Sequence, residues 1–420
     1  MPRPKRKPVS KSKRDYSELR VLIPIIAFFV LLGGLAYWAS RRQAQQERLT
    51  PLRVAGPAWI VESPAFADAK RNFEQRQPES VIETKAADGP ALIEKITARK
   101  PADLAVGLTR EQAAAVAGRV IAWDDFFDTH TARADFIGAF LADATAAKGL
   151  VMMPFVGDGV FLLTRPKWLA DAGVAAPFET WYQLTVAAAK LTKGTSRYGM
   201  AVDWGEANAG LSYASAMQAR GAAIAPAARS LKSAAALDAL RFWSDLVSGG
   251  LCSKDTVAGP PAARKAFVEG RAAILWTVAS ARQEATARLG PEEVGCAALP
   301  GSEAHGTAIV TYGAVIPTAS KQRDLAQRFV RDHLLSEPFQ RALAESAMRL
   351  PTLRRNYANL KGGEWQMILR VLQRGAGAKP HDLARLDRVL VQDLTPAITG
   401  STPPNEALAQ AAKDMAGSAR

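Results

Sequence analysis

The sequence holds 420 residues, of which 48% are hydrophobic and 22% are charged. This length allows two or three domains, and the apolar content allows a large core, so a globally disordered chain is excluded. The formal net charge of +14 would suggest nucleic-acid binding if it were spread over the whole chain. Most of it lies at the N-terminus, because residues 1–50 carry 11 Lys/Arg against 3 Asp/Glu and the other 370 residues carry 43 against 37. The body is weakly basic, and we expect no nucleic-acid partner.

Residues 21–39, VLIPIIAFFVLLGGLAYWA, form an apolar run without a charge. As a helix this run would span about 28 Å, which is enough to cross the core of a bilayer. Eight Lys/Arg precede the run and three follow it within ten residues. We therefore expect a basic cytoplasmic leader (1–20), a transmembrane helix (21–39), a linker (40–53) and an exported body.

A cleaved signal peptide is the alternative for this run. Tyr37, Trp38 and Ala39 do not form the small-x-small site that cleavage needs. A lipid-anchored form would need a cysteine directly after the run, and the first cysteine is Cys252. The pattern favours an uncleaved anchor.

After the linker, strand-like and helix-like segments alternate. Residues 54–61 read as a strand, and Ser63 and Pro64 then read as an N-cap and first helical residue of a helix that stops before Pro78. The next four segments read as strand, helix, strand and helix: SVIET, PALIEKITAR, ADLAVG and REQAAAVAG. This alternation predicts an α/β protein with open, mostly parallel sheets and helices on both faces.

Residues 152–174, MMPFVGDGVFLLTRPKWLADAGV, contain two strand-like runs, 152–156 and 160–163. Gly157, Asp158 and Gly159 separate them, and this break predicts a loop tip, a hinge or a binding site. An ordinary tight turn closed by an aspartate hydrogen bond is the simplest alternative.

Three helices follow from apolar spacing. Thr180 with Gln183 three residues later is typical of a capping box at the start of a helix. Apolar stripes predict further helices near 233–248 and 322–335.

The sequence offers little evidence for catalysis or metal binding. It contains no G-x-S-x-G, P-loop, G-x-G-x-x-G or C-x-x-C pattern, and its four histidines lack metal-ligand spacing. His333 falls in an apolar helix stripe and is interpreted as a packed core residue. Cys252 and Cys296 could form a disulfide in an exported body or remain free, and the second is favoured. We expect no enzyme, no cofactor and no metal.

Several aromatic residues lie near glycines in expected loops and strand ends. Indole and phenol rings combine a flat apolar face with a polar tip, which suits stacking on sugar rings or similar small ligands. Core packing is the alternative for each of them. These residues are Trp59, Trp204, Tyr213, Trp276 and Tyr312.

The order of segments resembles the extracytoplasmic solute-binding proteins of bacterial ABC importers, in the maltose/oligosaccharide group. The most specific piece is KGLVMMPFVGDGVFLLTRPKWLADAGVAAPFETWYQLTVAAAKLT. PAFADAKRNFEQRQPESVIET, KPADLAVG, RVIAWDDFF, KAFVEGRAAILW, VGCAALPG, YGAVIPTASKQRDLAQRFVRDHLLSEPFQRAL and RLPT also occur in the family's order. Each phrase alone is weak, but eight in sequence form a strong resemblance from about residue 54 to 417.

The resemblance implies a type 2 periplasmic-binding-protein-like fold, with two α/β lobes joined by crossing strands and a ligand held in the cleft between them. It places the first lobe at 54–157 plus 308–349 and the second at 158–307 plus 350–418. It implies crossings at PFVGDGV, near 307–312 and near 350–351. The ligand-contacting candidates are Trp59, Glu62, Asp158, Trp204, Tyr213, Trp276 and Tyr312, and the hinge candidates are Gly157, Gly159 and Gly313.

Two departures from the family pattern weaken the expectation of a linear oligosaccharide. Ser280 stands where the family often has tryptophan, and DLARLDRVLVQDL lacks a further aromatic. Trp276 or Trp365 could compensate.

The leading hypothesis is a membrane-tethered, monomeric solute-binding protein that takes a sugar or similar small polar ligand and docks on ABC permease subunits. The body would lie in the periplasm or extracytoplasmic space, held by one pass through the bacterial inner membrane. The alternatives are a ligand-sensing or scaffold protein on the same fold that has lost transport, and an α/β hydrolase or transferase.

Overall fold

The computed structural model describes residues 49–127, 132–146, 149–205, 208–222, 227–258, 260–377 and 383–417. One compact unit comprises Leu52–Arg76 and Ile82–Arg420, and residues 49–51 and Gln77–Val81 group apart from it. The leader and the transmembrane helix expected at 1–20 and 21–39 lie outside the described residues. Within the described ranges, no helix has both the length and the apolar character to cross a membrane.

A mixed sheet forms the centre of the larger unit. Its strand order is β2-β1-β3-β10-β6-β8-β7, with β9 and β11 also pairing with β6, and β12 with β10. The strands are β1 (Thr50–Gly56), β2 (Ser80–Ala86), β3 (Leu104–Leu108), β6 (Met153–Thr164), β7 (Tyr198–Val202), β8 (Ala272–Val278), β9 (Gly295–Ala297), β10 (Ala308–Val315), β11 (Leu350–Pro351) and β12 (Ala376–Gly377), with β4 (Thr145–Ala146) and β5 (Gly149–Leu150) in a separate pair.

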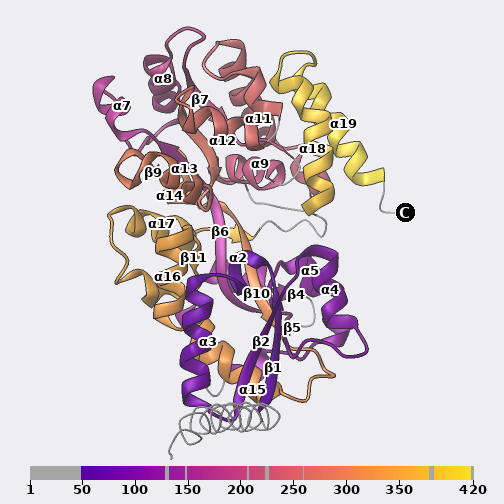
Figure 1. The fold of residues 1–420 in the computed structure, drawn as a ribbon. Coiled ribbons are helices and arrows are strands. Elements are labelled where there is room, and N and C mark those ends of the chain that lie inside the picture. The colour runs from indigo at the N-terminus through magenta and orange to yellow at the C-terminus, as the bar shows by residue number, and fades with distance from the viewer. Residues whose placement is uncertain are drawn as a thin grey trace, which may run out of the picture. The chain divides into compact units, whose positions relative to one another are not determined.

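Helices connect most of these strands (Figure 1). Before β6 they are α2 (Ala58–Val61), α3 (Pro64–Arg76), α4 (Gly89–Thr97), α5 (Arg110–Ala115) and α6 (Gly138–Asp143). Between β6 and β10 they are α7 (Pro166–Asp171), α8 (Trp181–Leu191), α9 (Ala209–Gln218), α10 (Ala227–Ser230), α11 (Ala234–Ser248), α12 (Pro260–Val268), α13 (Ala281–Leu289) and α14 (Ser302–His305). After β10 they are α15 (Arg323–Phe329), α16 (Glu337–Ala347), α17 (Glu364–Gln373), α18 (Leu383–Ile398) and α19 (Pro404–Gly417).

The helix signals in the sequence are confirmed by their hydrogen bonds. Ser63 Oγ accepts a hydrogen bond from Phe66 N at 3.1 Å, and α3 begins at Pro64. Thr180 Oγ1 accepts from Gln183 N at 3.1 Å while Gln183 Oε1 accepts from Thr180 N at 3.3 Å. These are the reciprocal bonds of a capping box, and they fix the start of α8.

Two strand predictions are wrong. The strand expected at 54–61 ends at Gly56, because Pro57 has no N–H for the ladder and starts the short helix α2. The break expected at Gly157, Asp158 and Gly159 does not exist, since β6 runs through it without interruption. Ladder pairing with β10 at all three residues, and with β11 at Gly157, keeps this segment extended.

The sheet is also less parallel than expected. β1 pairs parallel with β3, and β7 with β8, as βαβ units require. β10 pairs antiparallel with β3 and β6, and β6 pairs antiparallel with β8, β9 and β11. Each of these antiparallel pairs involves β6 or β10, whereas β10 pairs parallel with β12.

Buried apolar side chains form three clusters. One draws on residues 52–156 and 314–353, and a second on residues 160–308 and 386–412. A third gathers residues of 137–161, 279–309 and 344–372 around α6, α16 and α17. The lobe boundaries expected from the resemblance stay a prediction.

Candidate functional site

β6 changes partners along its length. Its first half pairs with β10, from Met153 opposite Ala314 to Gly159 opposite Ile309, and with β11 at residues 156 and 157. Its second half, from Val160, pairs with β8, and its last residues also pair with β9. We call residues 154–159 of β6, residues 309–313 of β10 and β11 the crossover. The three segments expected to be crossings thus lie side by side.

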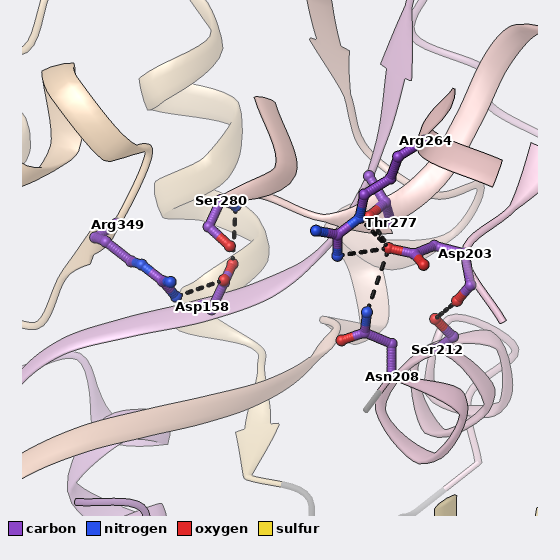
Figure 2. Close-up of polar contacts among 8 residues, drawn as sticks. All are labelled: Asp158, Asp203, Asn208, Ser212, Arg264, Thr277, Ser280 and Arg349. Carbon is purple, nitrogen blue, oxygen red and sulfur yellow. Dashed lines mark hydrogen bonds and ion pairs between the residues drawn. The ribbon is translucent and has the colours of Figure 1, made fainter. Parts of the chain in front are cut away.

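Asp158 is buried in the crossover, with 2% of its surface exposed, and both its carboxylate oxygens are occupied (Figure 2). Oδ1 accepts hydrogen bonds from the backbone N–H groups of Gly159 at 2.9 Å and Ser280 at 3.3 Å. Oδ2 accepts one from Nη1 of Arg349 at 2.9 Å. Ser280 is the N-cap residue of α13, so the carboxylate also lies near the positive end of that helix dipole.

Arg349 is a residue that sequence reasoning missed. It follows Met348, which ends α16 with φ 50°; the described residues include no other non-glycine residue with a positive φ. The bonds from Met348 N to Ala344 O (3.0 Å) and from Arg349 N to Leu343 O (3.2 Å) close this left-handed helix end. A methionine in place of the usual glycine at such an end costs about 1 kcal/mol. The turn takes the chain from α16 into β11.

The guanidinium of Arg349 lies against two aromatic rings. Its Cζ is 4.2 Å from the ring centre of Trp59 and 5.3 Å from that of Tyr312. The two rings meet edge to face with their centres 5.2 Å apart. Both rings are half-buried. Burial raises the pKa of the Tyr312 phenol, and the positive charge of Arg349 opposes that shift.

Trp59 and Tyr312 therefore adjoin Asp158 through Arg349, and these four residues form the candidate site. Three of them were predicted from the sequence. Glu62, at the C-terminal end of α2, is exposed, and its carboxylate forms no hydrogen bond or ion pair with a described residue.

The glycines of the crossover are tightly packed. A Cβ on Gly157 would come within 2.1 Å of the Phe140 ring, and one on Gly313 within 2.5 Å of the Met152 side chain. A Cβ on Gly159 would meet its nearest neighbour, Thr307, at 3.4 Å. The register of β10 against β6 shifts next to Gly313. Close approach therefore explains Gly157 and Gly313, and neither has a positive φ.

The other three predicted aromatic residues lie in the second apolar cluster. Trp204 and Trp276 are fully buried and Tyr213 is 2% exposed. Trp243 lies among them, with ring centres 5.1 Å from Trp204, 5.4 Å from Trp276 and 5.6 Å from Tyr213. Rings covered in this way offer no face to a solute. The structure does not support ligand contact by these three, because strand β8 and helices α9 and α11 pack them into the core.

The polar groups of Trp204 and Tyr213 point to the same interpretation, whereas Trp276 Nε1 is buried without a partner in the described structure. Trp204 Nε1 donates to Thr395 Oγ1 at 3.0 Å, and the Tyr213 hydroxyl donates to Ala236 O at 2.5 Å. Burial raises the pKa of the Tyr213 phenol. Polar groups that are satisfied inside the protein are typical of structural rings.

A second buried aspartate, Asp203, directly follows β7 and was also missed. Its Oδ2 accepts hydrogen bonds from Arg264 Nε (2.8 Å), Thr277 Oγ1 (2.6 Å) and Asn208 Nδ2 (3.3 Å) (Figure 2). Its Oδ1 is buried without a partner in the described structure. Burial raises the pKa of this carboxyl, and Arg264 and the hydrogen bonds oppose the rise. The group joins β8 and α12 to the start of α9.

The described residues hold no cluster of three or more His, Cys, Asp or Glu that could bind a metal ion. Cys252 and Cys296 are both free, and burial raises their pKa to about 11 and about 12. His333 packs on Phe73 and Phe329 with ring centres 5.5 Å apart in each case, and burial lowers its pKa. The interpretation of His333 as a core histidine is confirmed.

Comparison with known proteins supplies a family. Residues 60–340 match the family model described as "Bacterial extracellular solute-binding protein". No curated protein sequence matches the chain.

Solved structures show the same fold. The chain is similar to the sugar-binding protein MalE from Xanthomonas citri, at 16% identity and a TM-score of 0.75, over 88% of this chain and 98% of that one. It is similar to maltose-bound T. maritima MalE3, at 17% identity and a TM-score of 0.71, over 87% and 99%. It is also similar to the maltose/maltodextrin-binding domain MalE from Bdellovibrio bacteriovorus bound to maltotriose, at 18% and 0.67, over 88% and 99%. The chain therefore has the two-lobed α/β fold of periplasmic binding proteins.

Proposed function

Since the chain belongs to the bacterial extracellular solute-binding protein family, we propose that it binds a sugar or similar small polar solute between its two lobes. The solute is held without chemical change and is passed to the permease subunits of an ABC importer. The structural neighbours named above include proteins with maltose and maltotriose bound, which favours a carbohydrate.

One observation carries this proposal. Half-buried Trp59 and Tyr312 gather with Arg349 around Asp158, at the place where β6 leaves one set of partners for another. A solute held here would contact residues of both proposed lobes and would therefore favour a closed arrangement of the two lobes. Aromatic faces and charged hydrogen-bonding groups are the usual means of binding sugars.

We divide the body into lobes at 54–157 plus 308–349 and at 158–307 plus 350–418. The three segments of the crossover then act as the connection, with Gly157, Gly159 and Gly313 as its bending positions. The register shift beside Gly313 supports this assignment, because irregular pairing is where a strand bends.

The body is tethered by residues 21–39 as a single transmembrane helix, with residues 1–20 in the cytoplasm. Residues 21–39 contain no charge, and basic residues flank them on both sides. Tethering keeps a monomeric body beside its permease.

A thermal-shift screen of the full chain in detergent tests the proposal, with sugars, polyols, amino acids and oligopeptides as separate classes. We expect stabilisation by carbohydrates, since a ligand that binds only the folded state raises the unfolding midpoint, and more so as its concentration exceeds Kd. The Trp59→Ala variant should lose this shift while the Trp181→Ala variant keeps it. Stabilisation by oligopeptides alone, or by no class, would contradict a sugar-binding role.

A further inference from the structure

Arg349 covers the ring face that a stacked sugar would use. Its guanidinium carbon is 4.2 Å from the centre of the Trp59 ring and 5.3 Å from that of Tyr312. A pyranose on that face of Trp59 would need the same space. Because a guanidinium gains electrostatic attraction as well as contact from the ring, a neutral sugar would have to displace a better partner.

The same guanidinium still has donors to offer. Nη1 donates to Asp158 and the Tyr312 hydroxyl is a further hydrogen-bond partner, so these contacts use only part of the five N–H groups of the guanidinium. The side chain is 15% exposed, so part of it is open to solvent. Two parallel N–H groups on one edge match the two oxygens of a carboxylate.

Asp158 neutralises only part of the positive charge of Arg349. Its carboxylate also receives the N–H groups of Gly159 and Ser280 and lies at the start of α13. Part of its negative charge is therefore stabilised by the backbone. The nearby Arg282 is already neutralised by Glu364 at 3.0 Å, so it neither replaces Arg349 nor competes with it.

The position of Arg349 is fixed by the backbone. Met348 has a left-handed backbone conformation, which glycine adopts more readily than methionine does. This turn leads directly into β11, which is paired with β6 beside Asp158. The guanidinium is thus held in place before any solute arrives.

We infer that Arg349 sets the specificity of the site for solutes that carry a carboxylate, such as sugar acids, over the matching neutral sugars. This rests on the proposed function, because it assumes that a solute binds at the crossover. The carboxylate is held by the N–H groups of Arg349 that Asp158 and Tyr312 do not use, and the covered face of Trp59 excludes neutral rings.

Calorimetric titration of the full chain in detergent tests the inference with a matched pair of probes, digalacturonate and its methyl ester. Wild type should bind the acid at least about tenfold more tightly than the ester. Arg349→Met should lose that preference and gain affinity for the ester, because the ring face is freed. Arg349→Lys should keep part of the preference, since it retains the charge without the fork.

Arg288→Met, which removes an exposed arginine of α13, is the control and should leave the ratio of affinities unchanged. Equal binding of the two probes by wild type, or an unchanged ratio in Arg349→Met, overturns the inference. If Arg349→Met does not fold, the ratio in Arg349→Lys decides.

Failure of the inference and failure of the proposed function are distinguishable. If wild type binds neither probe but binds a neutral sugar in the screen, Arg349 has another role and the proposed function holds. If no carbohydrate binds wild type or either Arg349 variant, both are wrong.

Discussion

Asp158 and Asp203 are both buried carboxylates paired with one arginine, but their surroundings differ (Figure 2). Asp158 uses both oxygens, and its partner Arg349 rests on two half-buried rings beside three adjoining strands. Asp203 uses one oxygen, and the second apolar cluster with its fully buried Trp204 and Trp276 lies around it. The comparison teaches that a buried ion pair marks a candidate binding site only where its neighbours remain accessible.

Truncating one ring from each region gives the largest expected contrast. Trp276→Ala should lower the free energy of unfolding by about 4 kcal/mol, because it leaves a large cavity in the core. Trp59→Ala should lower it by about 1 kcal/mol, since the ring is half exposed. Urea unfolding measures both, and similar losses would show that the two regions do not differ in this way.

Removing the second aspartate should have the next largest effect. Asp203→Ala leaves Arg264 and Thr277 without their acceptor and should destabilise the protein by about 3 kcal/mol. Solute affinity of the folded fraction should stay within about twofold, because Asp203 does not adjoin the crossover. A strong loss of affinity in titrations at low temperature would instead assign Asp203 to the site.

Two glycines of the crossover provide a matched pair. Gly157→Ala should cost about 2 kcal/mol, because its Cβ would overlap the Phe140 ring. Gly159→Ala should cost less than about 1 kcal/mol, since its nearest contact would be 3.4 Å away. Thermal unfolding compares the two, and the opposite order would show that the strands give way at residue 157 rather than at 159.

A pH dependence is expected from Asp143, whose carboxylate accepts a hydrogen bond from Thr311 N, inside β10, at 3.0 Å. Burial raises the pKa of this carboxyl to about 6, so the folded state binds its proton more tightly than the unfolded state does. Its contribution to stability is complete below about pH 4 and is lost as the pH rises through about 6, by roughly 3 kcal/mol. Asp143→Asn should flatten the stability curve over this range, and an unchanged slope would show that another group titrates.

Local signals in the sequence predicted the elements well. The N-caps at Ser63 and Thr180 depend on neighbouring residues alone, so they could be read directly. The continuity of β6 could not, because glycine and aspartate favour turns in isolation and only ladder bonds from β10 and β11 keep them extended. Long-range pairing overrode local preference there.

The candidate site was predicted in part for a similar reason. Trp59, Asp158 and Tyr312 could be selected by residue type and family phrase. Arg349 could not be selected in this way. Its position depends on the left-handed backbone of Met348 and on contacts with Asp158 and Trp59, which are about 190 and 290 residues away in sequence. Trp204 and Trp276 were selected by residue type as well, but the structure buries both rings. Residue type alone does not distinguish a buried ring from an exposed one.

The uninterrupted course of β6 has a consequence for how this chain tolerates insertions and deletions. Successive side chains of a strand alternate between its two faces, so the alternation set in residues 153–159 continues into residues 160–164. Adding or deleting one residue near Gly159 would reverse the facing of every later position and misalign the pairs with β8 and β9. A change of two residues would restore the facing of the side chains but would shift those pairs along the strand. The alternation of side chains and the strand pairing therefore both limit changes in length at this point.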